Sequence, residues 1–228
     1  MKWLPYEVER PLQGLRFRMS RRLPDRAPSE IWPGIDTVPV RLLPFAGHFG
    51  NASQLELMVM CAVAKMTRPG TVFEFGTFDG LTTWHLAANG GPNTRLWTLD
   101  LPPDHPARAY PGHDRSVGRI HGVVVGEHFL GTAEGDRIEQ VWCDSLTFNP
   151  EPYRGLIDFC FVDAGHDYLH VWRDTANALL MVPPGGIIFW HDYSRWWPGV
   201  QKCLDRLSRR LPIVRVVGTS LAVLRVPG

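Results

Sequence analysis

A short strand-like run that ends in a glycine-containing loop is the feature that most constrains the fold of this chain. Residues 72–75 are β-favouring and mostly apolar, Gly76 and Gly80 follow, and a helix-like segment begins at Leu81. A strand that turns into a helix through small residues leaves backbone N–H groups available and lets a ligand approach the main chain closely. The pattern therefore predicts the first strand–loop–helix unit of an α/β protein, with a ligand at the loop.

Strand-like and helix-like segments alternate along most of the chain. Strands are predicted at Thr71–Phe75, Arg95–Leu99, Gln140–Cys143, Ile157–Val162 and Ile187–Trp190, and helices at Ser53–Met66, Leu81–Asn89, His170–Met181 and Gly199–Leu211. This alternation predicts a parallel sheet with helices on both faces. Ser53 and Glu56 form a capping box at the start of the first helix. Two β-favouring runs around Gly218 predict an antiparallel hairpin at the end of the chain.

Composition and charge exclude several classes of function. The 228 residues fit one domain, and a hydrophobic share of 44% is sufficient for a packed core. The formal net charge of +1 gives no overall field that would attract nucleic acid or an acidic membrane. No apolar run approaches the ~18 residues of a membrane span, the start lacks a secretory signal, and the four cysteines form no Cys-x-x-Cys pair. We therefore predict a cytoplasmic protein without nucleic-acid or membrane partners.

Two regions depart from the alternating pattern. Residues 1–45 are predicted to be an N-terminal extension to a domain formed by residues 46–228. Within the extension, Leu15–Met19 alternates apolar and basic residues, which predicts either a strand or arm that joins subunits of a homo-oligomer, or a solvated tail. The stretch Pro102–Asp136 mixes proline, glycine, histidine and charged residues, and a loop of this length is usually functional or flexible.

The glycine loop and an acidic strand end together indicate a nucleoside-containing cofactor. Asp100 ends the apolar run that lies twenty residues past Gly80. A carboxylate at the tip of the second parallel strand can accept from the two hydroxyls of a ribose. The dinucleotide fingerprint is absent because Glu74 stands where its first glycine would fall, and the phosphate-binding loop is absent too. The alternative is an ordinary strand–turn–helix, since short glycine motifs are weak signals.

Polar residues stand at the ends of all five predicted parallel strands. Ligands in open α/β sheets bind beyond the carboxyl ends of the strands, so these residues should lie together. They are Glu74 and Gly76 at the first strand, Asp100 at the second, Asp144 and Ser145 at the third, Asp163 and His166 at the fourth, and His191 and Asp192 at the fifth. Their convergence predicts an active site at this edge of the sheet.

The chain resembles a known class of enzymes at these motifs. The Glu-x-Gly-x-x-x-Gly pattern at Glu74 resembles motif I of the class I S-adenosylmethionine (SAM) methyltransferases. Ile157–Tyr168, with Val-Asp-x-x-His, and Pro184–Tyr193, with Gly-Gly and then His-Asp, resemble a branch that includes bacterial macrolide-sugar O-methyltransferases. The resemblance covers roughly Gly50–Arg225. It implies a Rossmann-like fold with a seven-stranded, mostly parallel sheet, an antiparallel C-terminal strand and helices on both faces.

The resemblance also implies SAM as cofactor and a role for each group of residues. Glu74, Gly76, Thr77 and Gly80 would shape the methionine side of the pocket, Asp100 would hold the ribose, Asp144 and Ser145 would lie by the adenine, and Asp163 would complete the cofactor site. A helix N-cap is an alternative role for Asp144, and the two roles can coexist.

Methyl transfer to a neutral hydroxyl requires a base or a metal, because the hydroxyl is a poor nucleophile. His166 is the candidate base, since imidazole titrates near neutral pH, although it could instead be a helix-start residue bonded to the backbone. His191 and Asp192 are further candidate catalytic residues. Together with Asp163 they could hold a divalent ion such as Mg²⁺ or Mn²⁺. His191 stands where a carboxylate is common, which puts Mg²⁺ in doubt and leaves Mn²⁺, Zn²⁺ or no metal open.

Without a metal, Asp192 would orient His191 or a substrate hydroxyl. Trp190, Trp196 and Trp197 flank this strand end and could form an apolar wall for the acceptor or pack in the core. The sequence thus predicts a SAM-dependent methyltransferase that O-methylates a small molecule, such as a natural product or a sugar. The alternatives are a SAM-binding enzyme of the same fold that catalyses another reaction, and a non-catalytic SAM-binding domain.

Overall fold

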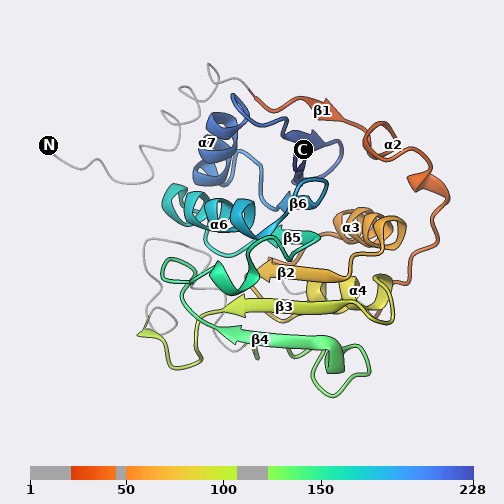
Figure 1. The fold of residues 1–228 in the computed structure, drawn as a ribbon, viewed down its shortest axis with the longest axis vertical. Coiled ribbons are helices and arrows are strands. Elements are labelled where there is room, and N and C mark those ends of the chain that lie inside the picture. The colour runs from red at the N-terminus through yellow and green to blue at the C-terminus, as the bar shows by residue number, and fades with distance from the viewer. Residues whose placement is uncertain (1–21, 45–49, 107–122) are drawn as a thin grey trace, which may run out of the picture.

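A mixed eight-stranded sheet with helices on both faces forms the frame of the protein in the computed structural model, which describes residues 22–44, 50–106 and 123–228 (Figure 1). The strand order is β1-β7-β8-β6-β5-β2-β3-β4. The strands are β1 (Asp25–Arg26), β2 (Thr71–Phe75), β3 (Arg95–Asp100), β4 (Ile138–Trp142), β5 (Phe159–Val162), β6 (Ile187–Trp190), β7 (Val214–Val216) and β8 (Ala222–Arg225). β2 to β6 are mutually parallel, whereas β8 is antiparallel to both β6 and β7.

Two pairs of helices cover the sheet, one pair on each face. α3 (Gln54–Thr67) and α4 (Leu81–Asn89) cover one face, and α6 (Tyr168–Met181) and α7 (Pro198–Leu207) cover the other. The alternation of side chains along β5 shows why both faces need cover: Phe159 and Phe161 pack on the α3–α4 side, while Cys160 and Val162 pack on the α6–α7 side. Shorter elements are α2 (Pro28–Ile31), η1 (Ile35–Thr37), η3 (Gly135–Arg137) and η4 (Glu151–Tyr153).

The chain reverses its direction of travel across the sheet between β2 and β5, which are neighbours in space. β3 and β4 follow β2 on one side, and β5 and β6 lie on the other. Such a switch point opens a crevice beyond the strand ends. Gly76 lies in this crevice with φ of 95°, and a Cβ there would be 2.3 Å from the carbonyl oxygen of Asp163. Only glycine fits this position.

The predicted fold class is confirmed, and the differences concern the ends of elements and one added strand. The predicted strand Ile157–Val162 starts only at Phe159, and the helix predicted to reach Leu211 ends at Leu207. Ser53 caps α3 with Glu56 in the predicted capping box. β1 extends the expected seven strands to eight, because Asp25–Arg26 pairs in parallel with β7. A two-residue strand is too short to show a periodicity in the sequence.

Residues 22–44 of the predicted N-terminal extension pack onto the rest of the fold. Leu23, Ile35 and Leu43 are buried in this part of the chain. Leu15–Met19, and with it the predicted subunit-joining arm, lies outside the described residues, so the homo-oligomer stays a prediction. Among the described residues no helix is long and apolar enough to cross a membrane, and the cytoplasmic location stays a prediction.

The described part of the long 102–136 stretch packs against the glycine loop. Gly126 N donates to Phe78 O, and His128 N donates to Asp79 O. Gly80 has φ of 83°, and a Cβ there would be 2.6 Å from the ring of Phe129. This second glycine is therefore required by packing against the stretch as well as by the turn into α4.

Candidate active site

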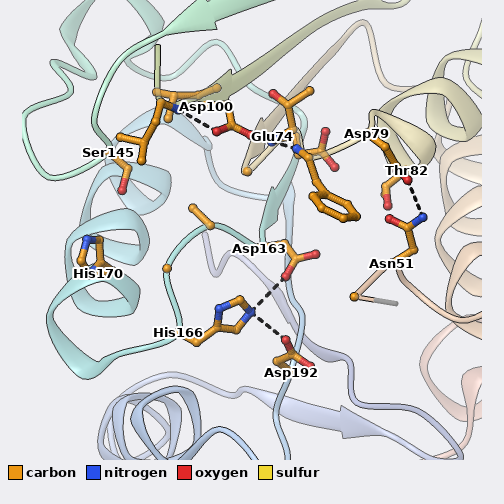
Figure 2. Close-up of a pocket in the computed structure, with 18 of the residues that line it drawn as sticks. Asn51, Glu74, Asp79, Thr82, Asp100, Ser145, Asp163, His166, His170 and Asp192 are labelled. Carbon is orange, nitrogen blue, oxygen red and sulfur yellow. Dashed lines mark hydrogen bonds and ion pairs between the residues drawn. The ribbon is translucent and has the colours of Figure 1, made fainter. Parts of the chain in front are cut away.

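A cavity of about 290 Å³ lies beyond the carboxyl ends of β2 to β6 (Figure 2). The predicted site residues on its wall are Glu74, Gly76, Thr77, Asp100, Asp144, Ser145, Asp163, His166 and Asp192. Two predicted residues are not on the wall: Gly80 starts α4 behind the loop, and His191 lies behind Asp163. The strand-end residues thus converge on one cavity, as the sequence predicts.

The end of the cavity near β2 is acidic. Glu74 is buried and accepts a hydrogen bond from Thr98 Oγ1 at 2.8 Å. Burial raises the pKa of Glu74 well above its usual range, and the charges of Asp163, Asp100 and Asp79 raise it further. A ligand with a positive charge would relieve this repulsion, so the electrostatics favour a cation here.

Asp100 is held in a fixed orientation by the backbone of the glycine loop. Its Oδ2 accepts from the N–H groups of Thr77 at 3.2 Å and Phe78 at 2.9 Å, and its Oδ1 accepts from Leu101 N at 2.7 Å. The carboxylate therefore ties the loop after β2 to the end of β3. These bonds fix the orientation of the Asp100 carboxylate at the cavity wall, where it can accept a hydrogen bond from a ligand hydroxyl.

Asp144 and Ser145 form a turn on the same wall. Asp144 Oδ1 accepts from Leu146 N at 2.9 Å, and residues 145–147 are a turn, so the helix N-cap considered for Asp144 is not what the structure has. Ser145 is buried against Asp174 of α6. Burial raises the pKa of Asp174 to about 7.

His166 faces two carboxylates at the other end of the cavity (Figure 2). Its Nε2 is 2.7 Å from Asp192 Oδ2 and 3.8 Å from Asp163 Oδ1, and its ring stacks on Trp197 at a centroid distance of 4.2 Å. Burial lowers the pKa of His166, but the nearby carboxylates of Asp163 and Asp192 outweigh it and raise the pKa to about 10. The raised pKa favours the imidazolium form of the ring at neutral pH.

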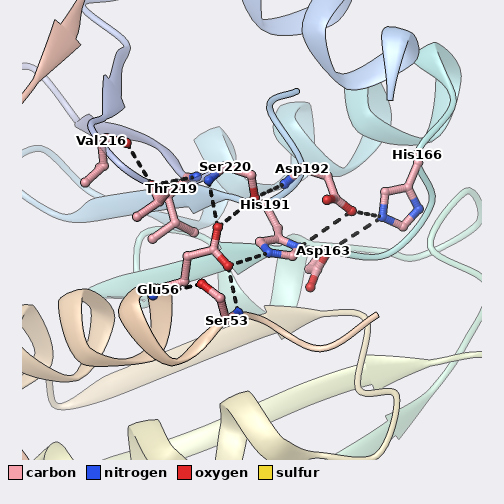
Figure 3. A network of polar contacts seen from close by, with 10 residues as sticks. Ser53, Glu56, Asp163, His166, His191, Asp192, Val216, Thr219 and Ser220 are labelled. Atoms are coloured by element: carbon pink, nitrogen blue, oxygen red, sulfur yellow. Dashed lines mark hydrogen bonds and ion pairs between the residues drawn. The ribbon is translucent and has the colours of Figure 1, made fainter. Parts of the chain in front are cut away.

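His191 is engaged at both ring nitrogens. Nδ1 is 3.2 Å from Asp163 Oδ1 and 3.6 Å from Asp192 Oδ2, while Nε2 is 3.2 Å from Glu56 Oε2 (Figure 3). The side chain is 7% exposed. The sequence places His191 at the tip of a strand, but the structure buries it beside Asp163, and it is not among the residues that line the cavity.

One group of residues has the composition of a metal site at the cavity wall. Asp163, His191 and Asp192 each offer one ligand atom, and these atoms all lie within 4.8 Å of one another. In a second group, beside the glycine loop, the ligand atoms lie equally close together; its members are Asp79, Glu127 and His128. Only the first group coincides with the predicted ligands.

Sequence reasoning missed several residues of this site. Asn51, just before α3, donates from Nδ2 to Asp79 Oδ2 at 2.7 Å, and both residues line the cavity. Asp79 lies inside the glycine motif and could have been singled out there. Of the three flanking tryptophans, only Trp197 lines the cavity, since Trp190 is fully buried and Trp196 is 58% exposed on the surface.

A family model described as a methyltransferase domain matches residues 73–193. A search of curated proteins gave no match. Among solved structures, the O-methyltransferase TomG from Streptomyces achromogenes, in complex with SAM, is 18% identical with a TM-score of 0.55, covering 99% of this chain and 100% of that chain. The fold is thus shared at low sequence identity.

Two further solved structures are similar over nearly their whole length. The O-methyltransferase from Bacillus cereus, in complex with S-adenosylhomocysteine (SAH), is 16% identical with a TM-score of 0.53, covering 96% of this chain and 99% of that chain. CalS11, a TDP-rhamnose 3′-O-methyltransferase of calicheamicin biosynthesis, is 17% identical with a TM-score of 0.52, covering 99% and 96%. These matches support the fold rather than a particular substrate.

Proposed function

Since this chain belongs to the family of methyltransferase domains, we propose that it is a SAM-dependent O-methyltransferase that acts on a hydroxyl of a small molecule. One observation carries the proposal. A single cavity joins the acidic end at Glu74 and Asp100 to the pair formed by His166 and Asp192. A methyl donor bound at the first end would face a proton acceptor at the second.

The chemistry of the cavity suits SAM as the cofactor. SAM carries a positive sulfonium and a positive ammonium group, which match the acidic groups around Glu74, among them Asp79 and Asp100. The ribose is assigned to Asp100 and the adenine to the turn at Asp144. After transfer the sulfur is neutral, so SAH loses part of this attraction and can leave.

Transfer of the methyl group is an in-line displacement, in which the acceptor oxygen attacks the methyl carbon as the bond to sulfur breaks. The protein contributes alignment of the two reactants and removal of the hydroxyl proton. The His166–Asp192 pair is assigned to take this proton. The positive charge of bound SAM opposes that of the imidazolium, which lowers the pKa of His166 towards the working pH. Asp192 then stabilises the imidazolium that forms when the proton is taken.

The acceptor is assigned to the class of natural products or their sugars. TomG and CalS11 act in the biosynthesis of such compounds, and the flat ring of Trp197 beside His166 offers an apolar surface next to the base. An assay with SAM and a panel of hydroxylated natural products, glycosylated and not, tests this assignment. Formation of a methyl ether together with SAH supports O-methylation, whereas SAM consumption without a methylated product would favour another SAM chemistry.

A divalent ion fits the group Asp163, His191 and Asp192. The Nε2 of His191 contacts the Glu56 carboxylate, and metal-bound histidines typically have such a partner on the second nitrogen. Two carboxylates and one imidazole suit Mn²⁺ or Zn²⁺ better than Mg²⁺. A bound ion would polarise the acceptor hydroxyl. Asp163 and Asp192 would then bind the ion and still contact His166.

Exhaustive chelation is therefore expected to reduce methyl transfer, and added Mn²⁺ is expected to restore it more fully than added Mg²⁺. The measurement is kcat before chelation, after chelation and after each addition. SAH binding by calorimetry serves as the control, because the cofactor contacts lie at the other end of the cavity. Full activity after chelation would leave Asp163 and Asp192 as hydrogen-bonding groups for His166 alone.

A further inference from the structure

Glu56 carries a buried carboxylate that does more than cap a helix (Figure 3). It is 5% exposed, on the first turn of α3 and outside the segment that the family model matches. Oε2 accepts from Ser53 N at 2.7 Å and lies 3.2 Å from His191 Nε2. Oε1 accepts from Ser220 N at 2.7 Å and from Ser220 Oγ at 2.8 Å. A capping box needs only the bond to Ser53, so three contacts have another purpose.

The contact with His191 holds the Nε2 side of that ring. The two oxygens of Glu56 accept from Ser53 N, Ser220 N and Ser220 Oγ, so the group is a carboxylate. A carboxylate only accepts hydrogen bonds. The hydrogen between the two side chains therefore belongs to Nε2 of His191, while Nδ1 faces the carboxylate of Asp163, which holds the ring from the other side.

The contact with Ser220 acts on the neighbouring residue. Asp192 has φ of 59°, in the left-handed region that is uncommon for residues other than glycine. Such a conformation persists only where the surroundings impose it. Asp192 N donates to Ser220 Oγ at 3.3 Å, and Tyr193 N donates to Ser220 O at 2.8 Å. Ser220 thus holds this turn while it donates to Glu56.

We propose that Glu56 is a positioning residue for methyl transfer, which holds the ring of His191 through its Nε2–H and, through Ser220, holds the turn at Asp192. Asp163 and Asp192 then present their carboxylates to His166 in one arrangement. The role rests on the proposed function, because His166 has a proton to remove only if the acceptor is a hydroxyl. Glu56 itself does not line the cavity and acts through its two partners.

The hydrogen position is measured by nitrogen NMR on full-length protein labelled with ¹⁵N-histidine and saturated with SAH. The His191 signals are assigned by their loss in His191→Gln. In the wild type we expect a hydrogen on Nε2 of His191. In Glu56→Gln the amide has one accepting oxygen and an NH₂ group that faces donors, so the signals of His191 and His166 should both shift.

Ser53→Ala is the matched control. It removes the hydroxyl that caps Glu56 N but leaves the backbone N–H of Ser53 and the Glu56–His191 contact, so it should lower thermal stability without shifting the histidine signals. With a known acceptor, Glu56→Gln should also lower kcat by about 10- to 100-fold at unchanged KM for SAM, as for other residues that orient a site.

If Nε2 of His191 carries no hydrogen in the wild type, the proposal is overturned, whether or not Glu56→Gln folds. Unchanged histidine signals in Glu56→Gln, or equal shifts in Ser53→Ala, would overturn it too. Failure of the wild type to bind SAH would instead count against the proposed function, so the two failures are distinct.

Discussion

Replacement of His166 by alanine is expected to lower kcat by about 10²–10⁴-fold, which is the usual contribution of a positioned general base. The imidazole lies 2.7 Å from Asp192 Oδ2 on the cavity wall, and alanine leaves nothing there to take the proton of the acceptor. Thr77 and Asp100, at the cofactor end, keep their contacts. Steady-state kinetics at saturating SAM and acceptor measure the loss.

The pH dependence separates a base from a packing residue. The pKa of His166 is raised, so the ring keeps its proton through neutral pH, and kcat/KM of the wild type should rise as pH increases towards that raised pKa. This acid limb should be absent in His166→Ala, while the SAH affinity stays near that of the wild type. Near-normal turnover of the variant at neutral pH would contradict the role of His166 and make Asp192 the next residue to test.

Replacement of Asp100 by alanine is expected to weaken binding of SAM and SAH by about 1.5–3 kcal/mol, the range for a hydrogen bond to a charged group. This corresponds to roughly a 10- to 150-fold rise in Kd. The variant loses the acceptor assigned to the ribose and also releases the N–H groups of Thr77 and Phe78. Calorimetric titration with SAH measures the change without an acceptor.

Asp100→Asn is the matched comparison for this position. It keeps the size of the side chain and one accepting oxygen but removes the charge, so its Kd should lie between those of the wild type and Asp100→Ala. Thermal unfolding of both variants shows whether the loop has been disturbed. Equal Kd values for Asp100→Ala and the wild type would remove Asp100 from the cofactor site.

The sheet and most of the cavity wall could be predicted because they depend on local patterns. A strand that is buried on both faces is continuously apolar, and the residues at its carboxyl end lie at an edge of the sheet that topology determines. Asp100, Asp163 and Asp192 follow this rule and reach the cavity. Gly76 also follows from local chemistry, since its backbone conformation and the close approach of Asp163 both require glycine.

The rest of the site depends on packing between distant segments. Asn51 reaches the cavity only because α3 docks on the face of the sheet beside α4. Glu56 has the pattern of a helix cap, and its contacts with His191 and Ser220 span 135 and 164 residues of sequence. His191 stands at a strand end in the sequence, but its contacts with Asp163 and Glu56 keep it away from the cavity wall. No periodicity in the sequence reports such long-range contacts.

The most direct test of the assignment as a SAM-dependent methyltransferase is calorimetric titration of the purified wild-type protein with SAM, SAH and NAD. The acidic, glycine-lined end of the cavity predicts saturable binding of SAM and SAH at one site per chain, with no comparable binding of NAD. Tight binding of NAD together with no binding of SAM would contradict it.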